Sequence, residues 1–176
     1  MNDPFATLGI DPTFSIDLAA VEQRHRDLSR ALHPDRFAGA PAAERRLALN
    51  RAIEVNEAWR AVRDPIKRAE ALMRRAGVPV GEVEEPKPSP DLLMEVMESR
   101  EALAEAVQTK DPAAVRRLGE EMQARMDATL AALGKGFDEA GADRVKLGAL
   151  LPKMGELRYI RRFLDEVSAF EEEMLV

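Results

Sequence analysis

The sequence predicts an all-α protein made of two helical modules, and three observations indicate this class. Ala, Leu, Glu, Arg and Met are abundant, whereas aromatic residues make up only 5% of the 176 residues, a balance that favours helix over sheet. Apolar residues recur at helical spacing, and no alternating strand pattern of useful length is present. Residues 77–90, "GVPVGEVEEPKPSP", hold four prolines and two glycines between two periodic regions. We therefore expect a linker over 78–89, between modules at 1–77 and 90–176.

The first module contains four predicted helical segments, at 4–8, 17–32, 41–63 and 64–76. Asp3 is the expected N-cap of the first segment, with Pro4 at its first helical position. The second segment has a one-sided apolar stripe, on which His25 also falls, made of Leu18, Val21, Leu28 and Leu32. Gly77 is well placed to terminate the fourth segment.

The second module contains three predicted helical regions, at 89–109, 111–133 and 143–174. The glycine-rich stretch "GKGFDEAGAD", residues 134–143, is expected to form the loop before the last region. Pro152 lies inside that region and should kink or restart the helix, because proline lacks the N–H that continues it. The last region has a core stripe of Leu150, Met154, Leu157, Ile160, Leu164 and Val167, with Tyr159, Phe163 and Phe170 on an adjacent face.

Composition excludes several classes of chemistry. The chain has no cysteine, which rules out disulfides, thiolate metal sites and thiol catalysis. It has only two histidines, which argues against a protein-held transition metal, and we expect no cofactor. No apolar run approaches the length of a bilayer span, and the N-terminus "MNDPFATLGIDP" lacks the basic and apolar parts of a secretory signal. We expect a cytoplasmic protein without a membrane partner, and a monomer, since no long coiled-coil seam is present.

The net charge of −6 is divided unequally between the modules. Residues 1–78 hold 13 Lys/Arg and 11 Asp/Glu, a balance of +2. Residues 79–176 hold 13 Lys/Arg and 21 Asp/Glu, a balance of −8. The overall acidity argues against nucleic acid as the main partner. The asymmetry predicts that the two modules bind different partners.

His33 begins the tripeptide His33-Pro34-Asp35 within "DLSRALHPDRFAG". Because the residue before a proline is pushed out of the α region, the second helix must end here, and the tripeptide lies at the tip of a loop. Catalysis is disfavoured, since a loop between two short helices supplies no substrate pocket. A histidine of no consequence at a helix C-terminus is the simplest alternative. The third alternative is that the tripeptide docks an acidic partner, because the preceding helix carries Arg24, Arg26 and Arg30, and Arg36 follows the tripeptide.

The helix "LLMEVMESREALAEAVQ", residues 92–108, carries more apolar residues than one packed face needs. One stripe at helical spacing consists of Leu92, Val96, Leu103 and Ala106. A second group lies beside it, flanked by Glu98, Arg100 and Glu101, and consists of Leu93, Met94 and Met97. This second group is either buried on a broad face or partly exposed for binding, where methionines make adaptable contacts. The pattern alone favours the core.

Three segments occur in the order found in a J domain, the module of DnaJ-type co-chaperones: "PFATLGI", the helix that ends in "LHPDRF", and "VNEAWRAVRDPIKRAE". Residues 4–72 resemble this module, which implies a J domain over 1–77, a helical hairpin with short flanking helices. The resemblance implies that a DnaK/HscA-type chaperone ATPase is bound through Arg24, Arg26, Arg30, His33, Pro34 and Asp35. His25 departs from the pattern, because an aromatic residue is usual there. We expect His25 to be semi-buried and structural.

The continuation "RAEALMRRAG" also departs from typical J domains and resembles HscB, the J-type co-chaperone of iron–sulfur cluster assembly. "LLMEVMESREAL" is similar to the first C-terminal helix of that family, and "ELRYIRRFLDEV" to its last. The resemblance implies a C-terminal three-helix bundle that binds an IscU-type scaffold protein through Leu93, Met94, Met97, Glu98, Arg100, Glu101 and Tyr159. The stretch 134–143 and Pro152 depart from the family pattern.

These features predict a co-chaperone and not an enzyme. It would stimulate the ATPase of a DnaK/HscA-type chaperone and deliver the IscU-type scaffold protein to it in iron–sulfur cluster biogenesis. Two alternatives stay open. One is a J-domain co-chaperone for a different client, and the other is a non-catalytic helical scaffold protein in which His-Pro-Asp is accidental.

Overall fold

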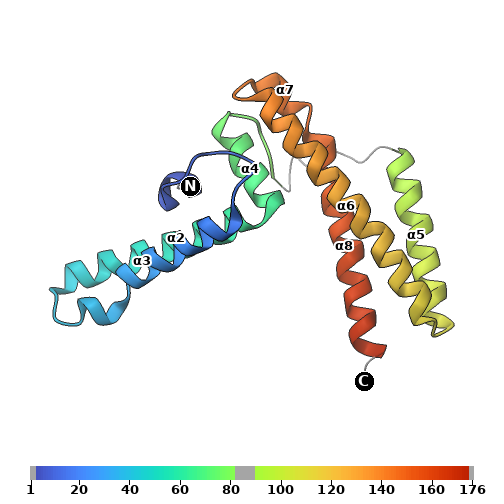
Figure 1. The fold of residues 1–176 in the computed structure, drawn as a ribbon, viewed down its shortest axis with the longest axis horizontal. Helices are drawn as coiled ribbons and strands as arrows, with labels where there is room; N and C mark the ends of the chain where they lie inside the picture. Colours follow the sequence, from blue (N-terminus) through green and yellow to red (C-terminus); the bar gives the residue numbers. More distant parts are fainter. Residues whose placement is uncertain (1–2, 82–89, 175–176) are drawn as a thin grey trace. The chain divides into compact units, whose positions relative to one another are not determined.

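A computed structural model describes residues 3–81 and 90–174, and all the regular elements in these ranges are helices (Figure 1). The predicted all-α class is confirmed. The chain divides into two compact units, Met1–Pro79 and Val80–Val176. Of the predicted linker, residues 82–89 lie outside the described residues. Val78, at its predicted start, is buried in the first unit, and its N–H donates to the Met73 carbonyl at 2.9 Å.

The described part of the first unit consists of α1 (Pro4–Leu8), α2 (Leu18–Ala31), the short 3-10 helix η1 (Pro34–Phe37), α3 (Ala42–Arg63) and α4 (Pro65–Arg75). The four predicted segments are confirmed, and η1 adds one turn inside the predicted loop. Asp3 caps α1, because its carboxylate accepts from the Phe5 N–H at 3.0 Å. Gly77 follows α4 with a φ of +73°, which glycine adopts without strain. α2 and α3 lie side by side as a hairpin with η1 at its turn (Figure 1).

The core of the first unit lies where α1 packs against the hairpin. Phe5 and Leu8 of α1 are buried together with Val21 of α2 and with Val55 and Val62 of α3. The predicted stripe of α2 is wrong at one end, because Leu18 is 47% exposed. Leu18 is the first residue of α2. It lies almost one turn before Val21, where the stripe enters the core.

The corner between α3 and α4 is fixed by two charged side chains. Asp64 caps α4, because its carboxylate accepts from the N–H groups of Ile66 and Lys67 at 2.9 and 3.1 Å. Arg68 donates to the Val62 carbonyl at 2.8 Å, and its guanidinium lies 5.0 Å from the ring centre of Phe14. Burial lowers the pKa of Arg68, and the Asp64 carboxylate opposes that shift. Arg68 thus joins the connection between α1 and α2 to the corner between α3 and α4.

The described part of the second unit consists of α5 (Pro90–Gln108), α6 (Pro112–Ala140), the short α7 (Arg144–Gly148) and α8 (Leu151–Met174). The three long helices pack against one another, with α6 between α5 and α8 in the order of the chain (Figure 1). The predicted three-helix bundle is confirmed. Pro152 is the second residue of α8, so the chain restarts a helix there, one of the two expected outcomes.

The predicted loop at 134–143 is wrong over most of its length. α6 continues to Ala140, with Gly134 buried and Gly136 half-buried in the bundle. A Cβ atom at Gly136 would lie 2.5 Å from Cδ2 of Leu150, which is itself buried. Glycine here permits close packing of the end of α6 against the turn before α8, and it is not a sign of a chain reversal.

The predicted core face of α8 also needs correction. Phe163, expected on the adjacent face, is fully buried, whereas Leu164, expected in the core, is half-buried. Because α8 packs against both α5 and α6, its buried face is rotated toward Phe163 relative to a stripe facing one neighbour.

We predict that Gly136→Ala destabilises the second unit by about 1 kcal/mol, because overpacking against Leu150 exceeds the gain in helix propensity. Gly148→Ala is the matched control, because a Cβ there meets no atom within 4 Å, and it should leave the stability unchanged or slightly raised. Thermal unfolding followed by circular dichroism checks both variants. Equal melting temperatures for the two variants would contradict this packing role of Gly136.

Candidate functional site

The tripeptide His33-Pro34-Asp35 lies at the tip of the hairpin, between α2 and η1. His33 has φ −61° and ψ 134°, the extended conformation that a following proline imposes. Its Nδ1 accepts from the Asp35 N–H at 3.3 Å and lies 3.5 Å from the Asp35 carboxylate. The side chains of His33 and Asp35 are 58% and 90% exposed. The turn therefore holds two polar side chains toward solvent in one defined geometry.

Arg26 and Arg30 extend this exposed surface along α2. Arg26 pairs with Glu22 at 2.6 Å, and Arg30 with Asp27 at 3.5 Å, and all four side chains are well exposed. Exposed pairs of this kind contribute about 0–1 kcal/mol each. The guanidinium groups of Arg26 and Arg30 can therefore leave these carboxylates and pair with those of an acidic partner at a small cost in free energy.

Arg24 differs from the other two arginines predicted to bind the chaperone. Its Nε donates to the carbonyl of Leu8 at 3.0 Å, and its guanidinium lies over Gly9, where a Cβ atom would come within 2.7 Å of it. Gly9 closes α1 with a φ of +64°. Arg24 therefore holds the C-terminal end of α1 against α2. This contact has no local signal in the sequence, because Arg24 and Leu8 are 16 positions apart.

His25 is half-buried, as expected, and its partners come from α3. Its ring stacks on Trp59, with the ring centres 5.4 Å apart and the planes 14° from parallel. Its Nε2 lies 2.9 Å from the Asn56 side-chain oxygen and 3.3 Å from the Ser29 hydroxyl. These contacts join α2 to α3 and make His25 a structural residue of the hairpin.

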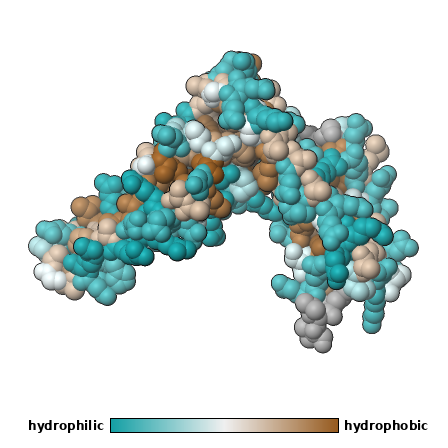
Figure 2. Space-filling view, in the orientation of Figure 1, coloured by the Kyte–Doolittle hydropathy of each residue, from teal (hydrophilic) through white to brown (hydrophobic). Residues whose placement is uncertain are grey.

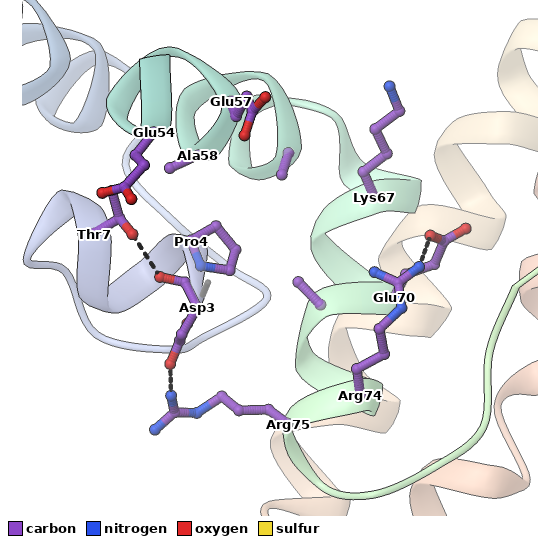
Figure 3. A pocket seen from close by; sticks show the side chains of 12 residues that line it. Asp3, Pro4, Thr7, Glu54, Glu57, Ala58, Lys67, Glu70, Arg74 and Arg75 are labelled. Atoms are coloured by element: carbon purple, nitrogen blue, oxygen red, sulfur yellow. Dashed lines mark hydrogen bonds and ion pairs between the residues drawn. The ribbon is translucent and has the colours of Figure 1, made fainter. Parts of the chain in front are cut away.

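A cavity of about 540 Å³ opens in the first unit between α1, α3 and α4 (Figure 3). Acidic and basic side chains both line it, beside the apolar Pro4 and Ala58. Asp3 pairs with Arg75 at its edge, and Arg74 pairs with Glu70 at 2.7 Å (Figure 3). The lining holds four acidic and three basic side chains, so the cavity has a charge balance of only −1, which selects weakly for a charged ligand.

The second candidate surface lies on α5. Leu92, Val96, Leu103 and Ala106 are buried, as the first stripe predicts. Leu93, Met94 and Met97 are 44%, 58% and 55% exposed, so the preference for the core that the pattern alone gave is wrong. Glu98 and Glu101 are exposed beside them. We call Leu93, Met94 and Met97 the α5 patch.

The buried stripe sets the rotation of α5 about its axis, and ion pairs lie on both sides of the helix. On one side, Arg125 of α6 pairs with Glu95 of α5 and donates to Glu156 of α8 at 2.9 Å. Burial alone would lower the pKa of Arg125, but the hydrogen bonds that its guanidinium donates to the carboxylates of Glu95 and Glu156 raise it. On the other side, Arg100 of α5 pairs with Glu166 of α8 at 2.5 Å. The α5 patch is held facing outward between these anchors.

Tyr159 lies on α8 at the level of the α5 patch. α5 and α8 run in the same direction (Figure 1), and Arg100 and Glu166 mark one shared level. Seven residues, almost two helical turns, separate Arg100 from Leu93 and Glu166 from Tyr159, so Leu93 and Tyr159 project from the same sides of their helices. Tyr159 is half-buried, and the Arg162 guanidinium lies 5.7 Å from its ring centre. Glu166 and Arg162 were not predicted, because pairing between distant helices leaves no local signal.

Three properties of the described residues bear on the kind of site. No group of three or more His, Asp or Glu side chains among them lies close enough to hold a metal ion. No helix in the described ranges is long and apolar enough to cross a bilayer. The visible surface is largely hydrophilic, with apolar side chains showing between the charged ones (Figure 2).

Comparison with known proteins identifies relatives over almost the whole chain. A family model described as "HSCB C-terminal oligomerisation domain" matches residues 88–168. The co-chaperone protein HscB homolog of Bordetella pertussis (strain Tohama I) is 37% identical over 171 residues, which cover 96% of this chain and 95% of the relative. The co-chaperone protein HscB homolog of Burkholderia multivorans is 34% identical over 165 residues, which cover 92% of this chain and 89% of the relative.

Solved structures show the same architecture. The chaperone HscB from Vibrio cholerae matches with a TM-score of 0.84 and 27% identity, over 98% of this chain and 99% of that one. The human co-chaperone protein HscB matches with a TM-score of 0.86, over 97% of this chain and 83% of that one. The human protein is 21% identical, so this likeness shows the fold alone.

We predict that Arg24→Ala lowers the free energy of unfolding of the first unit by about 1–2 kcal/mol, through loss of the charged hydrogen bond to Leu8. Arg30→Ala is the control and should change it by less than about 0.5 kcal/mol, because its pair is exposed. Trp59 is the single tryptophan and lies in the first unit, so urea unfolding followed by tryptophan fluorescence reports on this unit. Equal losses in the two variants would show that Arg24 has no special structural role.

Proposed function

This chain belongs to the HscB co-chaperone family, and on that premise we propose that it couples two partner proteins in iron–sulfur cluster biogenesis. It stimulates the ATPase of a DnaK/HscA-type chaperone and delivers an IscU-type scaffold protein to that chaperone. The observation that carries the proposal is the exposure of the α5 patch beside Tyr159, since the bundle does not need these side chains for its own core.

The chaperone is bound by the first unit. His33, Pro34 and Asp35 supply a rigid, exposed turn, and Arg26 and Arg30 supply exposed positive charge on the helix before it. Arg24, which the resemblance also implies, supports this surface by holding α1 to α2. His33 is a contact residue and not an acid or base. Binding favours the chaperone conformation that hydrolyses ATP, which requires only that the turn bind this conformation more tightly than the other.

The scaffold protein is bound by the second unit. Leu93, Met94 and Met97 supply apolar area, Tyr159 supplies an aromatic anchor, and Glu98, Arg100 and Glu101 supply a charged rim. An apolar centre with a polar rim is the usual anatomy of a protein interface. The flexible thioether side chains of the two methionines suit a surface that adapts to its partner.

Joining both surfaces in one chain raises the effective concentration of the scaffold protein near the chaperone. The chemistry of ATP hydrolysis belongs to the chaperone, and this chain acts as a binding protein without a catalytic site or a cofactor of its own. We further propose that it acts in the cytoplasm as a monomer.

We predict that His33→Gln strongly lowers stimulation of the chaperone ATPase while leaving the affinity for the scaffold protein unchanged. Loss of a coupling free energy of about 1–3 kcal/mol corresponds to a fall of about 5- to 150-fold in stimulation. A steady-state ATPase assay with chaperone and full-length chain measures the first quantity, and calorimetric titration with scaffold measures the second. Undiminished stimulation by His33→Gln would rule out the J-domain mechanism.

We predict that the double substitution Leu93→Ala, Met97→Ala weakens binding of the scaffold protein by about tenfold or more, because each truncation removes apolar contact area at the interface centre. Val145→Ala is the matched control, since Val145 is 83% exposed on α7 and lies outside the α5 patch. Calorimetric titration compares the three proteins, and circular dichroism confirms their folding. If the scaffold protein binds both variants equally well, the α5 patch is not its binding surface.

A further inference from the structure

The six methionine side chains between positions 73 and 154 fall into two clearly separated groups. Met73, Met122, Met126 and Met154 are at most 8% exposed and lie in the cores of the two units. Met94 and Met97 are 58% and 55% exposed, and both belong to the α5 patch. The chain has no cysteine, so thioethers are its only sulfur groups. An oxidant in solution therefore meets accessible sulfur on this patch, whereas the four core methionines are shielded from it.

We propose that Met94 and Met97 form an oxidation site that controls binding at the α5 patch. The oxidant that reacts with these two side chains is a peroxide, of which hydrogen peroxide is the simplest. Oxidation weakens binding of the scaffold protein, and the first unit continues to stimulate the chaperone. This inference rests on the proposed function, because the binding that oxidation weakens is that of the proposed scaffold protein.

The chemical step is complete without any further group on the protein. A lone pair on the methionine sulfur attacks one peroxide oxygen, the O–O bond breaks, and a new S–O bond forms. The second oxygen leaves as hydroxide and takes the proton from the oxygen that is now bound to sulfur, which gives the sulfoxide and water. The thioether is oxidised to a sulfoxide by two electrons, and the peroxide is reduced by the same two. Thiol-dependent methionine sulfoxide reductases reverse the change, with one enzyme for each sulfoxide epimer.

The change in polarity is what weakens binding. A sulfoxide is polar and accepts hydrogen bonds, whereas the thioether it replaces is apolar and flexible. Burying an unpaired sulfoxide oxygen against an apolar partner surface costs free energy, because its hydrogen bonds to water are lost. Leu93 is the third member of the patch and resists oxidation, so oxidation leaves a weakened surface and not a destroyed one. The ion pairs of Arg125 and Arg100 do not involve sulfur, so the position of α5 should be retained.

The test oxidises the full-length chain alone with hydrogen peroxide, removes the peroxide, and then adds an IscU-type scaffold protein. Peptide mass mapping should show one added oxygen at Met94 and at Met97 before Met73, Met122, Met126 or Met154 is modified. Calorimetric titration should show affinity for the scaffold protein reduced by at least about tenfold, and sulfoxide reductase treatment should restore it. Stimulation of the chaperone ATPase by the oxidised chain, in the absence of scaffold, should be retained.

The matched variant is Met94→Leu, Met97→Leu, which keeps an apolar patch of similar volume without sulfur. Its affinity after peroxide is compared with its own affinity before peroxide, and the ratio should stay near one. Equal oxidation of the buried methionines, an unchanged affinity of the oxidised wild type, or the same loss in the leucine variant would each overturn the inference. Failure of the untreated wild type to bind the scaffold protein would instead overturn the proposed function, and mass mapping would still test the oxidation site.

Discussion

The rotation of α5 about its own axis is the constraint on which the account of the second unit depends. α5 packs against α6 and α8, and its stripe of Leu92, Val96 and Leu103 fills that contact. The Arg125 pairs on one side and the Arg100–Glu166 pair on the other form only at this rotation and add to the packing of the stripe. A rotation that buried Met94 and Met97 would break both sets of pairs and expose the stripe. The apolar surplus on α5 therefore has no place inside the bundle and is available to a partner.

In the first unit, the comparable constraint is the conformation that Pro34 imposes on His33. It ends α2, starts η1, and places the imidazole and the Asp35 carboxylate beside one another in solvent. The contacts behind this turn are structural: Arg24 holds α1, the stacked pair of His25 and Trp59 joins α2 to α3, and Arg68 holds the next corner. Arginines on the same helix therefore have different roles: Arg24 supports the fold, whereas Arg26 and Arg30 belong to the exposed surface.

Much of the fold could be predicted because its signals are local. Caps such as Asp3 and Asp64, the prolines that begin helices, and the helical spacing of apolar residues each act within one or two turns. The errors occurred where a distant segment decides. Gly136 lies in a helix because the Leu150 side chain packs where a Cβ atom would be. Phe163 is buried because α8 packs against two helices. Leu93 is exposed because the other stripe of α5 already fills the contact with α6 and α8. The same reason hides Glu166 as the partner of Arg100, which lies 66 residues away.

The claim that the exposed face of α5 binds the scaffold protein is tested most directly by methyl NMR. A chain labelled with carbon-13 at its methionine methyl groups places a probe on the α5 patch, at Met94 and Met97, and probes in both cores, at Met73, Met122, Met126 and Met154. Addition of an IscU-type scaffold protein should shift or broaden the Met94 and Met97 signals and leave the core signals nearly unchanged. Binding that leaves the Met94 and Met97 signals unaltered would contradict the account.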